Sequence, residues 1–253
     1  MTPHLMGKGL QDIDTPALLV RRPILEQNLR RLQAVADKAG LELRPHIKAH
    51  KTPEIAQMQI RAGAAGVTAA KVGEAEVMAS AGIEDIFIAN EIVGPLKLAR
   101  LVALGRRVPK LSTAVDSIEV ARGLSEAFSG AGMTIDVLIE LDGGAGRCGV
   151  TEDCLIPLAE QVANLPGLAL VGIMAYGARS YQTRTPEERT RAVAAEGDFL
   201  ATQADRLRQA GFPISRVSGG STPTGLHYFA GCGLTEIRSG TYCLNDHNQV
   251  DLG

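Results

Sequence analysis

Residues that could do chemistry follow directly after short apolar runs of this chain. The most reactive of them is Lys48, which ends the run Leu43–Lys48. Period-two alternation along this run places three basic side chains on one face, namely Arg44, His46 and Lys48. A partly desolvated lysine beside cationic groups such as Arg147 has a lowered pKa and becomes a better nucleophile. Lys48 is therefore the candidate nucleophile, although an isolated lysine is more often a solvated surface charge.

Two glycine-rich turns add a second chemical feature. They are Gly219-Gly220-Ser221-Thr222 and Gly240-Thr241-Tyr242, and they follow the last two apolar runs. In barrels of parallel strands, backbone N–H groups at this place often bind a phosphate. Taken alone, the glycines could equally serve only to allow a positive φ. An amine together with a phosphate-binding turn indicates a cofactor that forms a Schiff base.

These residues need a scaffold that gathers the ends of many strands. Short β-branched runs alternate with amphipathic stretches along the chain, which is typical of parallel βα units. Nine runs are predicted to be strands: Ala17–Val20, Leu43–Lys48, Gly66–Lys71, Asp85–Asn90, Lys110–Val115, Thr134–Leu141, Leu168–Tyr176, Arg216–Gly220 and Thr235–Gly240. The predicted helices are Pro23–Ala39, Pro53–Ala62, Gly73–Ala81, Pro95–Leu104, Ser117–Gly130, Glu152–Asn164, Glu187–Ala210 and a short piece at Gly225–Ala230. The 253 residues suit an α/β fold of the (β/α)₈ TIM-barrel type.

One predicted strand exceeds the eight that a barrel uses. Ala17–Val20 precedes the first helix, so we expect it to lie outside the barrel and to pair with a strand of another unit. No linker or low-complexity tract divides the chain. We therefore expect a single domain over residues 1–253, with residues 1–20 as an arm.

Composition and charge exclude several other classes of protein. The formal net charge is −2 and the sequence pI is about 6.2, which provides no basic surface for nucleic acid or for an anionic membrane. The sequence contains neither an export signal nor an apolar stretch of about 18 residues, the minimum for a membrane span. The four cysteines show no metal-ligand spacing, so no metal site is predicted in this chain. A reducing cytoplasm fits these features best.

The motifs together resemble one known family. The octapeptide Arg44-Pro45-His46-Ile47-Lys48-Ala49-His50-Lys51 resembles the pyridoxal-phosphate (PLP) lysine motif of the D-threonine aldolase and D-serine dehydratase family. Four further segments agree with that family in type and spacing, namely residues 140–150, 174–176, 218–224 and 236–242. The family has the alanine-racemase-like fold of fold type III, in which a β domain follows the (β/α)₈ barrel. The resemblance extends from about Asp14 to the last residue.

The resemblance implies roles for the candidate catalytic residues. Lys48 would form the Schiff base with PLP, and Arg147 would approach the phenolic oxygen of the cofactor. Tyr176 would line the cofactor ring. His46, beside Lys48 on the same face of the predicted strand, is the fourth candidate.

The resemblance also implies how the rest of the cofactor is held. Gly219 to Thr222 and Gly240 to Tyr242 would hold the phosphate, in agreement with the glycine-rich turns. Arg238 would lie against the pyridine nitrogen, as the corresponding arginine does in alanine racemases. An always-charged donor there disfavours protonation of that nitrogen and weakens the cofactor as an electron sink.

Two departures from the family pattern bear on function. Family aldolases often carry a histidine directly after the tyrosine, where this chain has Gly177. The family's β domain, with ligands for a divalent metal (Zn or Mn), would follow Gly253, where the sequence ends. We expect the metal only together with that domain, whose sheet the Ala17–Val20 strand would join. The resemblance implies a homodimer, which the loss of the β domain should weaken.

The leading hypothesis is a PLP-dependent lyase that acts on small D-configured β-hydroxy amino acids. An aldolase would produce glycine and an aldehyde, whereas a dehydratase would produce pyruvate and ammonia from D-serine. Ser221-Thr222-Pro223-Thr224 favours the dehydratase-like branch only slightly, so this choice stays open. The alternatives are a PLP-binding barrel without turnover, an amino-acid racemase and a barrel that binds another phosphate ester.

Overall fold

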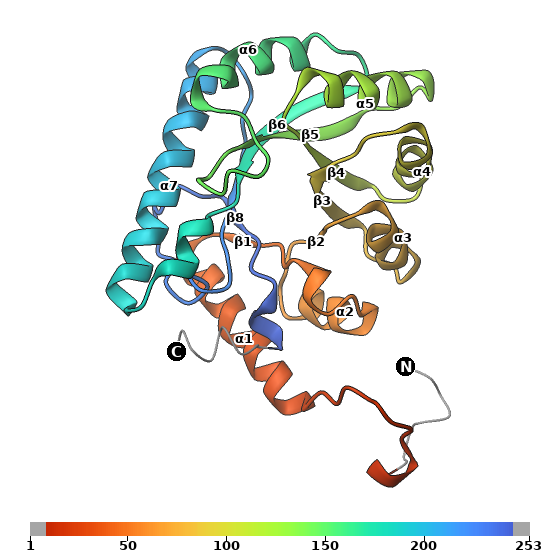
Figure 1. Ribbon diagram of the computed structural model, residues 1–253, viewed down its shortest axis with the longest axis vertical. Coiled ribbons are helices and arrows are strands. Elements are labelled where there is room, and N and C mark those ends of the chain that lie inside the picture. The colour runs from red at the N-terminus through yellow and green to blue at the C-terminus, as the bar shows by residue number, and fades with distance from the viewer. Residues whose placement is uncertain (1–8, 245–253) are drawn as a thin grey trace.

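The chain forms a barrel of eight parallel strands surrounded by helices, as Figure 1 shows for the computed structural model. The structure describes residues 9–244. The strands are β1 (Glu42–Leu43), β2 (Val67–Ala69), β3 (Asp85–Glu91), β4 (Lys110–Val115), β5 (Ile135–Leu141), β6 (Leu168–Ala175), β7 (Arg216–Gly219) and β8 (Glu236–Ile237). Their order in the sheet is β1-β8-β7-β6-β5-β4-β3-β2. The predicted (β/α)₈ architecture is therefore confirmed.

Hydrogen bonds around the first two strands close the sheet into a barrel. The N–H of Ala65 donates to the carbonyl of Leu43 at 2.9 Å, and the N–H of Thr68 donates to Pro45 at 2.8 Å. His46 and Thr68 form a parallel bridge next to these bonds. The carboxyl ends of the strands consequently meet at one mouth, where barrels of this type place their functional loops.

Seven α-helices of the described residues cover the outside of the barrel. They are α1 (Arg22–Ala39), α2 (Pro53–Arg61), α3 (Val72–Ser80), α4 (Pro95–Gly105), α5 (Ile118–Gly130), α6 (Glu152–Ala163) and α7 (Pro186–Gln209). Proline at the first position starts α2, α4 and α7; the starts of α2 and α4 agree with the prediction, and α7 begins one residue before the predicted Glu187. Gly40 ends α1 in the left-handed conformation. None of these helices has both the length and the apolar composition needed to cross a bilayer.

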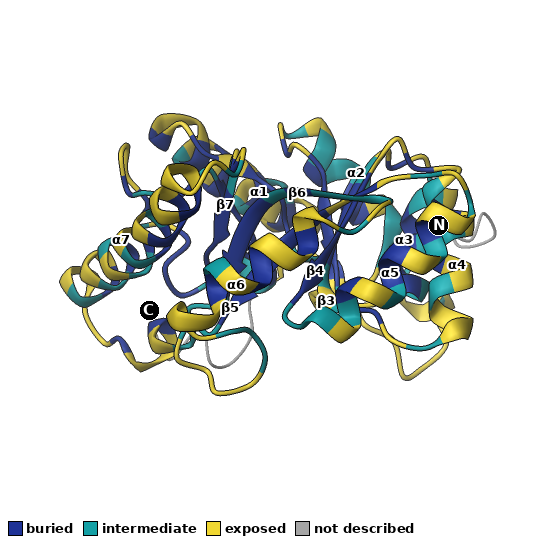
Figure 2. Ribbon diagram, turned by 90° about the horizontal axis from the view of Figure 1, so that it is seen from above, coloured by how far each residue is buried: buried dark blue, intermediate teal, exposed yellow. Residues whose placement is uncertain are grey.

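Strand side chains alternate between two environments. One set faces outward and packs against the helices in the main apolar core, for example Ile86, Val137 and Ile173. The other set points into the barrel, where a separate cluster fills the middle: Phe87, Ala114, Leu138 and Met174. Figure 2 shows the dark blue strands inside helices whose outer faces are exposed. This two-residue alternation is expected for a sheet that is buried on both faces.

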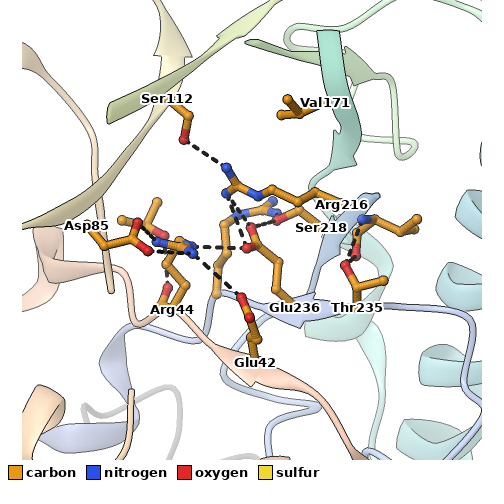
Figure 3. A network of polar contacts seen from close by, with 12 residues as sticks. Glu42, Arg44, Asp85, Ser112, Val171, Arg216, Ser218, Thr235 and Glu236 are labelled. Atoms are coloured by element: carbon orange, nitrogen blue, oxygen red, sulfur yellow. Dashed lines mark hydrogen bonds and ion pairs between the residues drawn. The ribbon is translucent and has the colours of Figure 1, made fainter. Parts of the chain in front are cut away.

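On the amino-terminal side of this apolar cluster, the barrel interior holds a network of ion pairs (Figure 3). Glu236 lies in its centre and accepts hydrogen bonds from Arg44, Arg216 and Ser218, at 3.0, 3.0 and 2.5 Å. Burial alone would raise the pKa of Glu236, but the charges of Arg216 and Arg44 lower it to about 2. Glu236 is therefore a charged and fully paired group inside the barrel.

Two of the predicted elements differ in the structure. Ala17–Val20 lies outside the barrel, as expected, but it forms no strand, because its exposed residues have no neighbouring strand among residues 9–244 with which to form a ladder. The short helix predicted at Gly225–Ala230 was wrong. The N–H groups of Gly225 and His227 bond to carbonyls three residues back, in single turns that do not continue. Of the predicted arm, residues 1–8 lie outside the described residues.

Candidate active site

A cavity of about 330 Å³ opens at the mouth of the barrel. This volume lies within the range of about 300–1,000 Å³ that is usual for small-molecule sites. Most of the predicted site residues line it: His46, Lys48, Arg147, Tyr176, Gly220, Ser221, Thr222, Arg238, Gly240 and Thr241. The fold thus brings together residues that lie far apart along the chain.

Lys48 reaches this cavity from a turn. The prediction that it ends a barrel strand was wrong, because residues Ile47–Ala49 form the 3₁₀ helix η3. The carbonyl of Ile47 accepts the N–H groups of both His50 and Lys51, at 3.1 and 2.7 Å, and this bends the chain away from the sheet. The Nζ of Lys48 lies 5.8 Å from the centroid of the Tyr176 ring.

The surroundings of Lys48 favour its uncharged form. Desolvation in the cavity is the main cause of its lowered pKa, and the guanidinium groups of Arg147 and Arg238 lower the pKa further. Burial, together with the charge of Lys48, lowers the pKa of His46 to about 2. The Nδ1 of His46 accepts the backbone N–H of Lys48 at 3.4 Å, so the neutral ring carries its proton on Nε2. His46 is therefore a neutral neighbour of the amine.

Arg147 and Tyr176 form another part of the wall. The guanidinium carbon of Arg147 lies 5.1 Å from the centroid of the Tyr176 ring, within the range of a cation–π contact. Arg147 belongs to the glycine-rich loop after β5. Asp142 shapes this loop, because its Oδ1 accepts three successive backbone N–H groups, from Gly144, Ala145 and Gly146. The loop thereby places the exposed guanidinium of Arg147 at the cavity.

Arg238 lines the cavity from the interior of the barrel. Its buried guanidinium donates hydrogen bonds to the Oγ of Ser218 and to the carbonyl of Ala175, the latter at 2.8 Å. Ser218 in turn donates to Glu236, so Arg238 is joined to the network of Figure 3. Burial lowers the pKa of Arg238, whereas the carboxylate of Glu236 opposes that change. Arg238 is therefore a fixed donor at the base of the cavity.

The two glycine-rich turns meet at one side of the cavity. The N–H groups of Gly240 and Thr241 converge on the Oγ1 of Thr222, at 3.3 and 3.1 Å. A side chain at position 240 would bring its Cβ to 2.8 Å from the carbonyl oxygen of His46. Only glycine therefore allows this turn to approach the lysine motif so closely. Backbone N–H groups and a hydroxyl gathered at one point of the wall are the kinds of group that bind a phosphate.

Two N–H groups of the first turn bond to side chains outside the two turns. The N–H of Gly220 donates to the Oε1 of Glu196 at 2.8 Å. The N–H of Ser221 donates to the hydroxyl of Tyr228 at 3.3 Å. Gly220 has a φ of +95°, a conformation that favours glycine. These two residues therefore shape the turn, whereas Thr222 presents its hydroxyl to the second turn.

Two predicted cofactor residues do not line the cavity. Gly219 ends β7 on the side that faces α7, and Tyr242 packs against the apolar core, where its hydroxyl accepts a hydrogen bond from Gln59 at 3.2 Å. Among the lining residues that were not predicted as site residues, those larger than alanine are Asn90, Cys148, Met174 and Tyr181. The first three end strands or belong to quoted motifs, which was a usable signal. Tyr181 lies in the 3₁₀ helix η4 (Ala178–Gln182), which has no such signal.

Two carboxyl groups lie beside the cavity. The Oε1 of Glu140 is 3.7 Å from the Nη2 of Arg147. Burial, followed by the charge of Glu91, raises the pKa of Glu140 to about 8, so Glu140 favours its protonated form at neutral pH. Glu91 also forms, with Asp116 and Cys148, the one group of potential metal ligands among residues 9–244. The ligand atoms of this group lie within 4.8 Å of one another. The expectation that this chain binds no metal stays a prediction.

Comparison with known proteins assigns the chain to a family. Residues 20–247 match the model of the alanine racemase N-terminal domain. The chain belongs to the alanine racemase N-terminal domain family. It is 42% identical over 245 residues to a D-threonine aldolase of an Arthrobacter species, a match that covers 96% of this chain and 64% of that enzyme. It is 33% identical over 248 residues to a 3-hydroxy-D-aspartate aldolase of Paracoccus denitrificans strain Pd 1222, with the same two coverages.

Solved structures of this family have the same fold. The D-threonine aldolase from Filomicrobium marinum superposes with a TM-score of 0.89 at 38% sequence identity, covering 96% of this chain and 66% of that one. The chain thus spans about two thirds of the length of the relatives that it matches. These relatives agree with the family that the lysine motif and the glycine-rich turns resemble.

Proposed function

We propose that the chain is the barrel part of a PLP-dependent lyase that acts on D-configured β-hydroxy amino acids. The proposal rests on one observation: a lysine amine with a lowered pKa shares a cavity with two backbone N–H groups that converge on the hydroxyl of Thr222. The names of the relatives support the class of substrate, because both are aldolases of D-amino acids. The choice among aldolase, dehydratase and racemase belongs to the same proposal, and we place aldolase first on the 42% identity.

The residues of the cavity fit PLP. Lys48 would hold the cofactor through an imine with its aldehyde. Thr222, Gly240 and Thr241 would bind its phosphate, because their polar groups already converge. Arg238, fixed at the base of the cavity, would face the ring nitrogen. When bound, PLP supplies an electron sink for the pair released from a bond at the substrate α-carbon.

The chain's own groups bind charge and move protons. Because the pKa of Lys48 is lowered, its Nζ is more readily uncharged, and an uncharged amine can attack an aldehyde or accept a proton. Arg147 holds a positive charge over the edge of the cavity, where it can bind an anionic oxygen. His46 is neutral and therefore adds no further positive charge beside the amine. A divalent metal, if the reaction uses one, is expected together with the family's second domain.

The proposal is tested by replacing Lys48. Addition of PLP to the protein should produce an imine absorbance band near the visible range, and Lys48→Ala should abolish it. Borohydride trapping followed by peptide mass spectrometry should place the label on Lys48. Lys51→Ala is the matched control, because Lys51 is a neighbouring lysine paired with Glu74. A band that survives in Lys48→Ala would remove the assignment.

Product analysis then separates the candidate reactions. Incubation of the PLP-loaded protein with D-threonine or D-serine, with Zn²⁺ or Mn²⁺ present, should release an aldehyde with glycine, or pyruvate with ammonia. Interconversion of enantiomers without either product would identify a racemase. An imine band without any turnover would identify a PLP-binding barrel.

A further inference from the structure

Glu196 connects two loops of the proposed cofactor site. It lies on α7, where its Oε1 accepts the N–H of Gly220 at 2.8 Å. The same carboxyl group accepts the N–H of Gly177. Gly177 follows β6 and Gly220 follows β7, and these two strands are neighbours in the sheet. One side chain from the outer layer of helices therefore joins the exits of two adjacent strands.

Close packing fixes the position of this carboxyl group. At Gly197, the next residue of α7, an added Cβ would lie 1.6 Å from the carbonyl oxygen of Cys232. The loop before β8 consequently packs directly on the backbone of α7. At position 177, an added Cβ would lie 2.8 Å from the Cδ of Glu196. Glu196 therefore leaves little room for a side chain at position 177, where this chain has glycine and family aldolases often carry a histidine.

We propose that Glu196 is a positioning residue for the phosphate end of the cofactor site. Its hydrogen bond turns the N–H of Gly220 toward α7, so that the turn presents Thr222 to the N–H groups of Gly240 and Thr241. The inference rests on the proposed binding of PLP.

Removal of the carboxyl group should weaken binding of the phosphate and leave the aldehyde chemistry unchanged. Without Glu196, the N–H groups of Gly177 and Gly220 lose their acceptor, and both loops can leave the positions that align the phosphate donors. In Glu196→Ala, we expect the Kd for PLP to rise by about tenfold, the equivalent of about one lost hydrogen bond in the positioning of the phosphate donors. The Kd for pyridoxal, which has the aldehyde but no phosphate, should stay within about twofold.

Both constants are measured by titration of the imine absorbance, with the urea unfolding midpoint of each variant as a check on folding. Glu196→Gln should be intermediate, because its amide oxygen can still accept one N–H. Asp198→Asn is the matched control, since it removes an exposed negative charge from the same helix. An equal loss of affinity for PLP and pyridoxal, or no loss for PLP, would overturn the proposal.

A double-mutant cycle tests the contact with Gly177 independently. Gly177→Ala should weaken PLP binding because its Cβ meets the carboxyl group of Glu196. In the Glu196→Ala background, the same substitution should have a smaller effect. If the effects of the two substitutions on PLP affinity add, the proposed contact between Gly177 and Glu196 is wrong. If the wild-type chain forms no imine with either aldehyde, the proposed function fails, whereas failure of the inference alone leaves the wild-type band intact.

Discussion

At the scale of single residues, Arg147 contributes to the reactivity of Lys48 from an exposed position. After desolvation, its charge is the largest cause of the lowered pKa of Lys48. Arg147→Gln should therefore raise that pKa and move imine formation to higher pH. Imine formation with pyridoxal, followed by borohydride trapping across a pH series, measures this shift. The control is Arg122→Gln, which changes an exposed arginine of α5. Coincident pH profiles for Arg147→Gln and the wild type would contradict the prediction.

Glu140 makes stability depend on pH in an identifiable range. Burial and Glu91 raise its pKa from 4.5 to about 8, so the folded chain keeps this proton longer than the unfolded chain does. The contribution of protonated Glu140 to the free energy of unfolding is complete below pH 4.5 and is lost as the pH rises to about 8. Glu140→Gln cannot ionise. Its free energy of unfolding should therefore rise relative to that of the wild type as the pH increases from 4.5 to about 8. Urea unfolding at several pH values measures the difference, and a difference independent of pH would contradict the prediction.

The sequence predicts the groups that do chemistry better than the groups that hold them. Lys48, Arg147 and Arg238 were predicted from motifs, and they line one cavity. Glu140 and Glu196 were not predicted as site residues. A glutamate in a strand or a helix gives no local signal that it is desolvated, because neighbours from other segments bury it, such as Glu91 beside Glu140 and Gly220 beside Glu196.

At the scale of elements, the start of α7 shows how a helix is specified locally. The Oγ1 of Thr185 accepts the N–H of Glu188, and the carboxylate of Glu188 accepts the N–H of Thr185, both at 3.2 Å. Thr185→Ala should lower the free energy of unfolding by about 1 kcal/mol, because it removes this cap. Urea unfolding measures the loss. Thr202→Ala, at an exposed position of the same helix, should leave stability nearly unchanged or slightly higher.

Helix starts were predictable, whereas strand lengths were not. Proline and a preceding threonine mark the starts of α2 and α7 in the sequence itself. β8 contains only Glu236–Ile237, although the apolar run predicted Thr235–Gly240. Beyond Ile237, the backbone bonds to side chains and loops, as in the contact of Gly240 with Thr222. Such contacts depend on the folded neighbours, so a residue pattern cannot reveal where the strand ends.

At the scale of the whole molecule, the ion pairs inside the barrel couple stability to acid. The pKa of Glu236 falls from 4.5 to about 2, so its contribution is complete above pH 4.5 and is lost as the pH falls toward 2. Glu236→Ala should lower the free energy of unfolding by about 3–5 kcal/mol, because it leaves Arg216 without its carboxylate partner inside the barrel and removes one of the partners of Arg44. Glu236→Gln should reduce the dependence of stability on pH between 4.5 and 2. Urea unfolding at pH 6, 4 and 3 measures both effects, and an unchanged slope would contradict the assignment.

The architecture was predictable because βα alternation is repeated along the whole chain. The charged interior of the barrel was not, because Arg44, Arg216 and Glu236 look like ordinary polar residues at alternate strand positions. Only closure of the sheet brings β1, β7 and β8 together and makes these residues neighbours.

The contact between Gly197 and Cys232 limits how the helix length can change in evolution or in engineering. One residue inserted between Pro186 and Gly197 would rotate the preceding turns by about 100° relative to the rest of α7. The capping box at the start of the helix and the contact of Gly197 with the loop before β8 would then no longer lie on their present faces of the helix relative to each other. Insertions and deletions should therefore be tolerated after Leu207 and rejected before Gly197.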